Sequence, residues 1–295
     1  MRAPIYFTKM HGAGNDFVML NGIRQKINPT PAFIRYLADR RLGIGADQVL
    51  LVEPPETTEA DFKYRIFNCD GEEVEQCGNG ARCFAVFVRE EGLTSSREIL
   101  VETKKALIRP RVESDGRVTV DMGCPIFPLD SIPFQPAGLE RKRVGVTDDF
   151  SLLLDQEHVH FSVVSMGNPH AVIFVEDVDE APVKTLGAKI EKYPAFPARV
   201  NVGFLECLNQ HEGRIRVWER GAGETLACGT GACAAAVVGI QRGIFEKEVT
   251  LHARGGVLTI QWDGLINPNA HVYLTGPVQT VFNGSITLPE DIFYD

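Results

Sequence analysis

Two stretches of the chain, QCGNGARC at residues 76–83 and ACGTGAC at residues 227–233, share the frame Cys-Gly-x-Gly-Ala. Each frame runs into a segment with the apolar pattern of a helix, so Cys77 and Cys228 stand just before a helix start. A thiol at that position lies at the positive end of the helix dipole, where the thiolate is favoured. One such thiol indicates a nucleophile. Two in matching frames indicate a pair of bases that face one substrate from opposite sides.

The match between the two frames extends along most of the chain. Asn168 follows Asn15 by 153 residues, and the same offset relates Asn201 to Gln48. After a gap of two residues the offset is 151, and it relates Arg65 to Arg216, Phe67 to Trp218, Asn68 to Glu219, Glu73 to Glu224 and Cys77 to Cys228. A period this long is not that of a solenoid repeat, so the sequence predicts two homologous domains.

We place the first domain at residues 1–124 plus 277–295, carrying Cys77, and the second at residues 125–276, carrying Cys228. Residues 125–146 are proline-rich and predict a loop at the boundary.

The sequence of each half indicates many short strands and a few helices, which predicts an α+β fold and not alternating βαβ units. Residues 32–41 predict a helix, preceded by the cap signal Asn-Pro-Thr-Pro. Residues 229–242 predict a second helix, so rich in Ala, Gly and Val that protein must surround it.

Composition is that of an ordinary globular protein, with 44% hydrophobic and 23% charged residues among 295. There is no apolar run long enough to span a membrane and no signal peptide, so we expect a cytoplasmic protein without membrane partners. The net charge of −9 without a basic stripe argues against nucleic acid as a partner. The glycine-rich turns match no nucleotide-binding motif.

The seven cysteines argue against a secreted disulfide framework, because their number is odd and the chain is long. No Cys-x-x-Cys pair occurs and the histidine spacing completes no zinc pattern, so we expect no metal.

Opposed thiols suit inversion of the α-carbon of an amino acid. One cysteine takes the α-proton as thiolate, and the other returns a proton from the opposite face as thiol. Backbone N–H groups at Gly78-Asn79 and Gly229-Thr230, at two helix starts, could hold the α-carboxylate as charge spreads onto it. This chemistry needs no pyridoxal phosphate, so we expect no cofactor.

The matched positions predict a composite site for a small zwitterionic substrate, because uncharged amides offer both donor and acceptor groups. Its amide members are Asn15, Gln48, Asn68, Asn168 and Asn201. Glu219-Arg220 replaces Asn68-Cys69 in the second copy, and the added arginine indicates a second carboxylate or polar end on the substrate. His170 and Glu219 are candidates to tune the thiols.

Plainer interpretations exist for each of these residues. Asn beside Gly serves turns, a free cysteine is usually a small buried residue, and Glu219-Arg220 could be a surface ion pair.

The residues in these motifs resemble the diaminopimelate epimerase family. The matching stretches include FTKMHGAGNDFV, FNCDGEEVEQCGNGARC, GNPHAV and WERGAGETLACGTGACA, between residues 7 and 234. The resemblance implies two pseudo-symmetric duplicated domains, each a strongly curved, mostly antiparallel sheet around a central helix, with the site in the cleft between them. It also implies a cofactor-independent isomerase that interconverts LL- and meso-diaminopimelate for lysine and peptidoglycan precursors.

The resemblance further implies individual roles. Cys77 and Cys228 form the acid and base pair, with Cys228 as proton acceptor in the LL-to-meso direction, and His170 and Glu219 modulate them. The implied substrate-binding residues are Asn15, Gln48, Asn68, Gly78, Asn79, Asn168, Asn201, Glu219, Arg220, Gly229 and Thr230. It implies a homodimer, although Phe282 stands where many relatives have a tyrosine linked to dimer contact. Residues 134–160 form a longer stretch than the family pattern has.

Three other functions stay open on the residues alone. The nearest is a proline or hydroxyproline racemase of the same architecture. The others are a non-catalytic amino-acid-binding protein with duplicated lobes, which would tolerate loss of both thiols, and a redox protein that cycles a Cys77–Cys228 disulfide.

Overall fold

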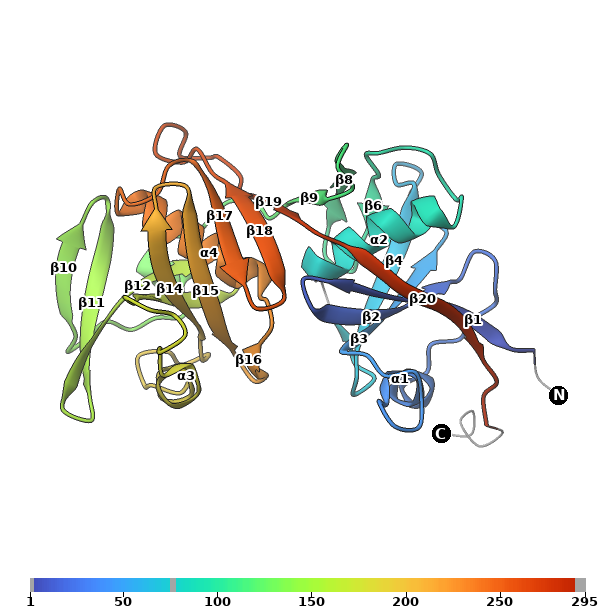
Figure 1. The fold of residues 1–295 in the computed structure, drawn as a ribbon, viewed down its shortest axis with the longest axis horizontal. Helices are drawn as coiled ribbons and strands as arrows, with labels where there is room; N and C mark the ends of the chain where they lie inside the picture. Colours follow the sequence, from blue (N-terminus) through green and yellow to red (C-terminus); the bar gives the residue numbers. More distant parts are fainter. Residues whose placement is uncertain (1–2, 75–77, 290–295) are drawn as a thin grey trace. The chain divides into compact units, whose positions relative to one another are not determined.

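The computed structural model describes residues 3–74 and 78–289, which form two compact units. Unit 1 comprises residues 1–120 and 276–295, and unit 2 comprises residues 121–275. Most of the elements are labelled in Figure 1. The domain boundaries drawn from the sequence, after residues 124 and 276, stay a prediction.

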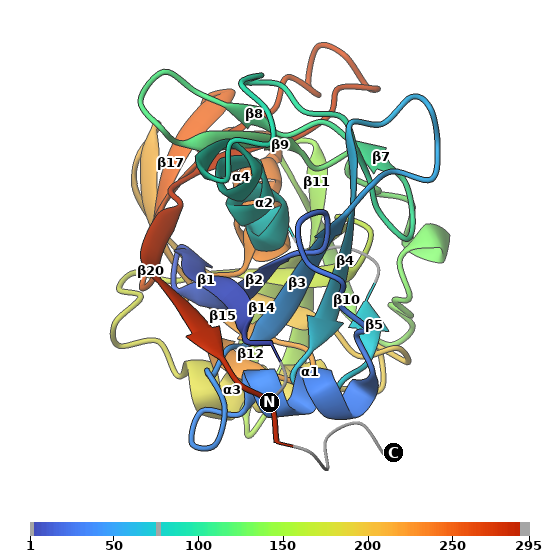
Figure 2. The same ribbon diagram turned by 90° about the vertical axis from the view of Figure 1, so that its right-hand side faces the viewer.

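Unit 1 contains one sheet with the strand order β20-β1-β2-β3-β4-β6-β7, and β5 pairs with β4. The strands are β1 (Ile5–Gly12), β2 (Asn15–Asn21), β3 (Gln48–Glu53), β4 (Phe62–Asn68), β5 (Glu73–Val74), β6 (Val101–Glu102), β7 (Leu107–Ile108) and β20 (Gln279–Ile286). A short hairpin, β8 (Arg111–Val112) and β9 (Val118–Asp121), follows. In Figure 2, α2 (Gly78–Glu90) lies above the strands β1 to β4 and α1 (Pro31–Ala38) lies below them.

Unit 2 repeats this plan with the strand order β10-β11-β12-β13-β14-β15-β17-β18-β19, and β16 pairs with β15. The strands are β10 (Glu140–Val144), β11 (Thr147–Leu154), β12 (Glu157–Ser165), β13 (Pro169–Phe174), β14 (Asn201–Asn209), β15 (Glu212–Glu219), β16 (Gly223–Thr225), β17 (Glu248–Ala253), β18 (Gly256–Gln261) and β19 (Tyr273–Gly276). Its helices are α3 (Val183–Glu191) and α4 (Gly229–Gln241), with a 3₁₀ turn, η1 (Leu129–Ser131).

Strand register confirms the duplication. Val49 pairs with Phe67 in unit 1. The offset of 153 relates Val49 to Val202, the offset of 151 relates Phe67 to Trp218, and Val202 pairs with Trp218 in unit 2. Both sheets are mostly antiparallel, and the exceptions repeat: β2–β3 and β4–β6 are parallel, as are β13–β14 and β15–β17.

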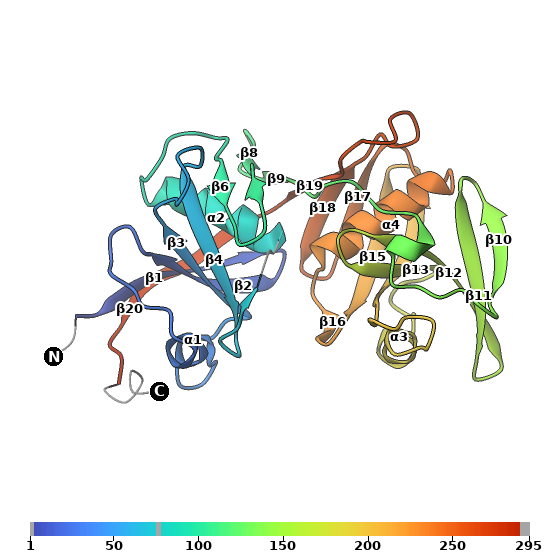
Figure 3. The ribbon, with the colours of Figure 1, turned by 180° about the vertical axis from the view of Figure 1, so that it is seen from behind.

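Each unit wraps its sheet around one helix. Helix α4 contacts six strands of its sheet, β12, β13, β14, β15, β17 and β18, and nearly all its residues are buried (Figure 3). A helix that meets protein on every side can be apolar on every side, which explains its Ala- and Val-rich sequence. Helix α2 likewise contacts β1, β2, β3 and β8. The predicted α+β class and the curved sheet around a central helix are confirmed.

Helix α1 is shorter than the predicted 32–41. Thr30 caps it by accepting a hydrogen bond from the Phe33 N–H, and Pro31 occupies the first turn. It ends at Ala38 because Asp39 is extended and its carboxylate accepts the N–H groups of Arg41 and Leu42, both at 2.7 Å. Those bonds replace the next helical turn.

The predicted loop over residues 125–146 is wrong in its last part, where β10 forms. Its sequence, ERKRV, shows no apolar alternation because β10 is an exposed edge strand, paired only with β11 in the sheet order. The longer stretch at 134–160 thus adds a hairpin to the sheet. Phe134 anchors it, with its ring centroid 4.8 Å from that of Phe150 and 4.9 Å from that of Phe196.

Candidate active site

Cys228 lies where the sequence predicted it, immediately before a helix. It is the N-cap residue of α4, with extended backbone (φ −118°, ψ 114°), and its side chain is buried. Its Sγ lies 3.6 Å from Thr230 Oγ1, and the Gly231 N–H also bonds it. The first turn of the helix therefore supplies hydrogen bonds to sulfur, which favour the thiolate.

Two other influences act against the thiolate. Burial, and then the negative charge of Glu219, raise the pKa of the Cys228 thiol well above its ordinary value despite the bonds from Thr230 and Gly231. Thr225 Oγ1 holds that carboxylate by donating to Glu219 Oε1 at 2.5 Å. At neutral pH Cys228 is accordingly a thiol, the form that donates a proton.

Asn168 links the β12–β13 turn to the start of α4. Its Nδ2 donates to Thr230 Oγ1 at 3.3 Å, and its Oδ1 lies 3.0 Å from His170 Nε2. Burial, together with the nearby charge of Arg220, lowers the pKa of His170 to about 3, so the imidazole is neutral. The bond to Asn168 places its proton on Nε2, because an amide oxygen only accepts. His170 therefore orients Asn168 and carries no charge.

Asn201 ties together three segments of unit 2. This buried residue donates from Nδ2 to the carbonyl of Pro169 at 3.0 Å and accepts the Arg220 N–H on Oδ1 at 3.0 Å. The Arg220 guanidinium is exposed and donates to the carbonyl of Ala198 at 3.1 Å. It keeps further donors for a ligand, since a guanidinium carries five.

Unit 1 holds the other predicted residues. Asn79, in the first turn of α2, donates from Nδ2 to Asn15 Oδ1 at 3.2 Å. Gln48 donates to Asn68 Oδ1 at 2.9 Å across the β3–β4 pair. Asn15–Asn79 and Asn168–Thr230 occupy equivalent positions, so both units bond a turn asparagine to the start of the central helix.

The predicted residues thus fall into two groups, one in each unit. Within unit 2, Cys228, Thr230, Asn168 and His170 form one continuous set of contacts, which Glu219 joins at the thiol. Cys77 lies in residues 75–77, outside the described part of the chain.

Three polar residues that bond the predicted site residues were not identified from the sequence. Thr225 holds Glu219, Asp47 accepts from Asn15 Nδ2 at 3.0 Å, and the fully buried Arg82 donates to Asn79 Oδ1 at 2.8 Å. Arg82 lies inside the first cysteine frame, but the equivalent position in the second copy is Cys233. Matching residues between the two copies therefore did not identify Arg82.

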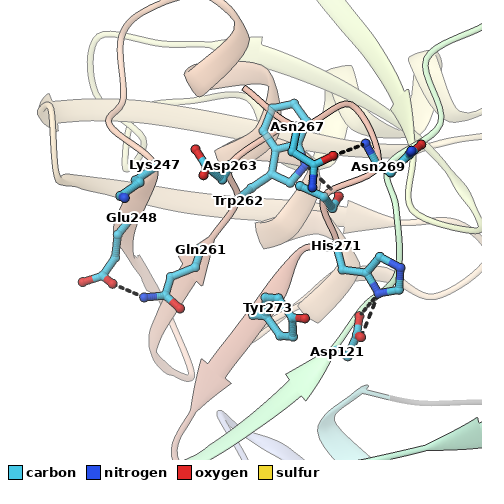
Figure 4. Close-up of a pocket in the computed structure, with 11 residues that line it drawn as sticks. Asp121, Lys247, Glu248, Gln261, Trp262, Asp263, Asn267, Asn269, His271 and Tyr273 are labelled. Atoms are coloured by element: carbon cyan, nitrogen blue, oxygen red, sulfur yellow. Dashed lines mark hydrogen bonds and ion pairs between the residues drawn. The ribbon is translucent and has the colours of Figure 1, made fainter. Parts of the chain in front are cut away.

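A separate cavity of about 610 Å³ lies on unit 2, beside β17, β18 and β19 (Figure 4). Most side chains around it are exposed. His271 bonds Asp121 at 2.8 Å, and the indole of the buried Trp262 donates to the Ala270 carbonyl at 3.2 Å. None of the site residues predicted from the sequence lines it.

Within residues 3–74 and 78–289 no helix could cross a membrane. The same part of the chain holds no cluster of His, Cys, Asp or Glu arranged to ligate a metal.

Comparison with known proteins gives one family for nearly the whole chain. The family model described as "Diaminopimelate epimerase" matches residues 7–128 and 162–281. The chain is 54% identical over 284 residues to a diaminopimelate epimerase of Burkholderia thailandensis, covering 96% of this chain and 98% of that protein. It is 53% identical to one of Paraburkholderia xenovorans, covering 96% and 99%.

Solved structures at low identity share the fold. A phenazine biosynthesis protein of the PhzF family from Bacillus anthracis superposes with a TM-score of 0.68 at 14% identity, over 97% of this chain and 100% of that one. A hydroxyproline epimerase from Agrobacterium vitis superposes with a TM-score of 0.66 at 16% identity, over 98% and 94%.

Proposed function

The chain belongs to the diaminopimelate epimerase family, and from this we propose that it interconverts LL- and meso-diaminopimelate. The observation that carries the proposal is the 53–54% identity to relatives of that name over 96% of the chain. The chain covers 98–99% of those relatives, so the comparison concerns the whole enzyme.

The proposed chemistry is proton transfer between two cysteines and one α-carbon. One thiolate removes the α-proton, and the opposite thiol protonates the carbanion from the other face. The raised pKa of Cys228 suits the donor role, with Cys77 as the base. In the LL-to-meso direction, where family resemblance makes Cys228 the acceptor, the Cys228 thiol must first lose its proton to solvent and become a thiolate. The carboxylate of Glu219 beside the thiol opposes that step.

The carbanion is stabilised through the α-carboxylate in this proposal. Helices α2 and α4 each have 13 residues, and each presents its first N–H groups at Gly78-Asn79 or Gly229-Thr230. Free N–H groups at a helix start bind anions, and the dipole adds to the attraction. No pyridine ring is needed to delocalise the charge, so the enzyme works without pyridoxal phosphate.

The remaining polar residues recognise the distal end of the substrate. The exposed guanidinium of Arg220 can bind a second carboxylate through two parallel hydrogen bonds. Asn68, Gln48, Asn168 and Asn201 supply fixed amides, and Glu219 accepts from an ammonium group. A proline-type substrate has no distal carboxylate, and the racemase alternative rests on shared fold alone.

We further propose a cytoplasmic homodimer that supplies lysine and peptidoglycan precursors. Strand β20 ends the order of its sheet, and it exposes Val281 (52%) and Phe282 (48%), with Tyr6 (61%) on the adjacent β1. An exposed apolar edge strand pairs readily with a second copy. Light scattering coupled to size-exclusion chromatography would show a mass near 65 kDa for two copies of 32.5 kDa.

The deciding experiment is proton NMR of LL-diaminopimelate with reduced protein in D₂O, without pyridoxal phosphate. We expect the α-proton signal of LL-diaminopimelate to lose intensity while the meso form accumulates, and both effects to vanish in Cys77→Ala and Cys228→Ala. Proline and hydroxyproline serve as comparison substrates. No exchange with diaminopimelate by the folded, reduced protein would reject the proposed substrate.

A further inference from the structure

Glu191, the last residue of α3, is a buried carboxylate that binds the end of β15 and the turn after it. The Trp218 indole donates from Nε1 to Glu191 Oε2 at 2.8 Å, and the Gly221 backbone N–H donates to Oε1 at 2.9 Å. Trp218 and Gly221 flank Glu219 and Arg220 in the sequence. One carboxylate therefore holds the chain on both sides of the pair that distinguishes unit 2 from unit 1.

The two donors require a carboxylate and not an amide. An indole N–H and a backbone N–H donate and never accept, and each meets a different oxygen of Glu191. A glutamine would place its NH₂ group against one of them, so that two donors would face each other. Burial opposes the charge of Glu191, but the bonds from Trp218 and Gly221 and the charge of Arg199 lower its pKa. The carboxyl is therefore ionised at neutral pH, and both bonds are charge-assisted.

The bond to Gly221 fixes the turn that carries Arg220. Residues 220–222 form this turn between β15 and β16, and Gly221 has a φ of +78°, a conformation that favours glycine. The Arg220 N–H is bound by Asn201 and the next N–H along the chain by Glu191, and both of these side chains are 3% exposed. The backbone of Arg220 is thus attached to buried groups, although its guanidinium is exposed. A side chain that starts from a fixed point loses less freedom when it binds a ligand.

Helix α3 can bind Trp218 because a glycine faces the indole. A Cβ atom on Gly187 would lie 2.6 Å from the Cβ and 2.7 Å from the Cγ of Trp218, closer than such atoms can approach. The absence of a side chain at Gly187 therefore lets Trp218 pack directly on the helix. Glu191 follows four residues later on the same helix face, where its carboxylate meets the indole N–H.

Unit 1 lacks this arrangement, so the duplicated fold does not require it. Three positions matched by offsets of 153 and 151 differ together: unit 1 has Ala38, Phe67 and Cys69 where unit 2 has Glu191, Trp218 and Arg220. Ala38 ends α1 as Glu191 ends α3, and it is buried without a polar side chain. The acceptor and the indole donor thus occur in the copy that carries the arginine, which ties the buried carboxylate to Arg220 and not to the fold.

We propose that Glu191 is a positioning residue that holds Arg220 in place to bind the distal carboxylate of the substrate. The inference rests on the proposed function, since it assigns a task in that same site. The effect of Glu191 passes through the Gly221 N–H and needs no contact between Glu191 and the substrate. Trp218 supplies the second bond, which keeps the carboxylate directed at the turn.

Steady-state kinetics of the full-length enzyme with diaminopimelate test the inference. Glu191→Gln keeps the shape of the side chain but leaves one N–H opposite a donor. It should raise KM about tenfold while kcat changes less than about threefold, because proton transfer at Cys228 does not involve Arg220. Arg199→Met is the matched control. Arg199 lies 3.5 Å from Glu191 Oε1 and is 56% exposed, so its loss should change KM less than about twofold.

Trp218→Phe provides a matched pair of double variants. With the indole N–H removed, a glutamine at position 191 can turn its oxygen to Gly221 without meeting a second donor. Glu191→Gln with Trp218→Phe should therefore recover KM to within about threefold of wild type. Glu191→Ala with Trp218→Phe leaves no acceptor for Gly221 and should stay about tenfold above wild type. Unit 1 has alanine and phenylalanine at these two positions, so the duplicated fold accepts both.

A third comparison shows whether the effect passes through Arg220. When Arg220→Met has already removed the guanidinium, adding Glu191→Gln should raise KM by less than about twofold more. A general loosening of unit 2 would instead multiply KM by about a further tenfold. Thermal unfolding shows which variants are folded, and the two double variants keep the test decisive if Glu191→Gln alone is not.

Three results would overturn the inference: an unchanged KM in folded Glu191→Gln, equal KM values in the two double variants, or an effect of about tenfold in the Arg220→Met background. Failure of the proposed function looks different, because wild-type protein would then not epimerise diaminopimelate at all.

Discussion

Replacing Arg216 should destabilise unit 2 far more than replacing its equivalent Arg65 destabilises unit 1. Duplication places the arginines on equivalent strands, Arg216 on β15 and Arg65 on β4, each paired at 2.7 Å with a glutamate, Glu224 or Glu73. The pairs differ in burial. The side chains are 9% and 5% exposed in unit 2, but 27% and 23% exposed in unit 1.

Burial sets the expected magnitude of each loss. Arg216 also donates to the carbonyls of Val178 and Asp179, at 2.9 and 3.1 Å, so its removal leaves several buried acceptors. Burial raises the pKa of Glu224, but the bond and charge of Arg216 and the charge of Arg254 lower it further, so the carboxyl stays ionised. Removing one partner of a buried ion pair costs about 3–5 kcal/mol, and we expect a loss of about 3 kcal/mol here because Arg254, 2.9 Å from Glu224 Oε1, still pairs with the carboxylate. The partly exposed Arg65 pair contributes about 1 kcal/mol or less.

Urea unfolding can measure the two losses separately. Both tryptophans, Trp218 and Trp262, lie in unit 2, so their fluorescence follows that unit, whereas circular dichroism follows the whole chain. With a slope of about 2 kcal/mol per molar, Arg216→Met should lower the fluorescence midpoint by roughly 1.5 M. Arg65→Met should leave it in place.

An apolar replacement of both partners supplies the control. Arg216→Met with Glu224→Leu should recover much of the loss, because two apolar groups leave no buried charge. Equal losses for Arg216→Met and Arg65→Met, or a loss below about 1 kcal/mol for Arg216→Met, would refute the argument from burial.

Three further outcomes can be measured. Arg40 and Lys9 hold the pKa of Asp16 well below its usual range, against the opposing effect of burial. The stability that this provides is present above about pH 4 and is lost as the pH falls further. Asp16→Asn should therefore flatten that loss in urea titrations between pH 7 and 3. Glu219→Gln should lower the pKa of Cys228, so mass-spectrometric alkylation of this cysteine should begin at lower pH than in wild type; an unshifted profile would contradict the role of that charge. Gly239→Ala should cost about 1–3 kcal/mol, because the added methyl would lie 2.4 Å from the Phe245 ring, and an unchanged melting temperature would show that α4 can move.

Much of the fold was predictable from the sequence because duplication makes the chain its own comparison. Matched offsets identified the paired strands and the residues at their ends, and the register of β3–β4 and β14–β15 agrees with them. Helix α4 was predictable from its composition. Strand β10 was not, because an exposed edge strand bears no burial pattern.

The sequence by itself determined the duplication, the fold class and the family, since these depend on residue order and spacing that any folded form must keep. Only the tertiary structure decided the state of individual groups. The thiol form of Cys228 follows from burial and from Glu219, nine residues away in sequence, and the neutral His170 follows from burial and the charge of Arg220. The hydrogen bonds that connect Asp47, Asn15, Asn79 and Arg82 join three separate segments of the chain. Hydrogen bonds and desolvation act through space, so spacing along the chain could not reveal them.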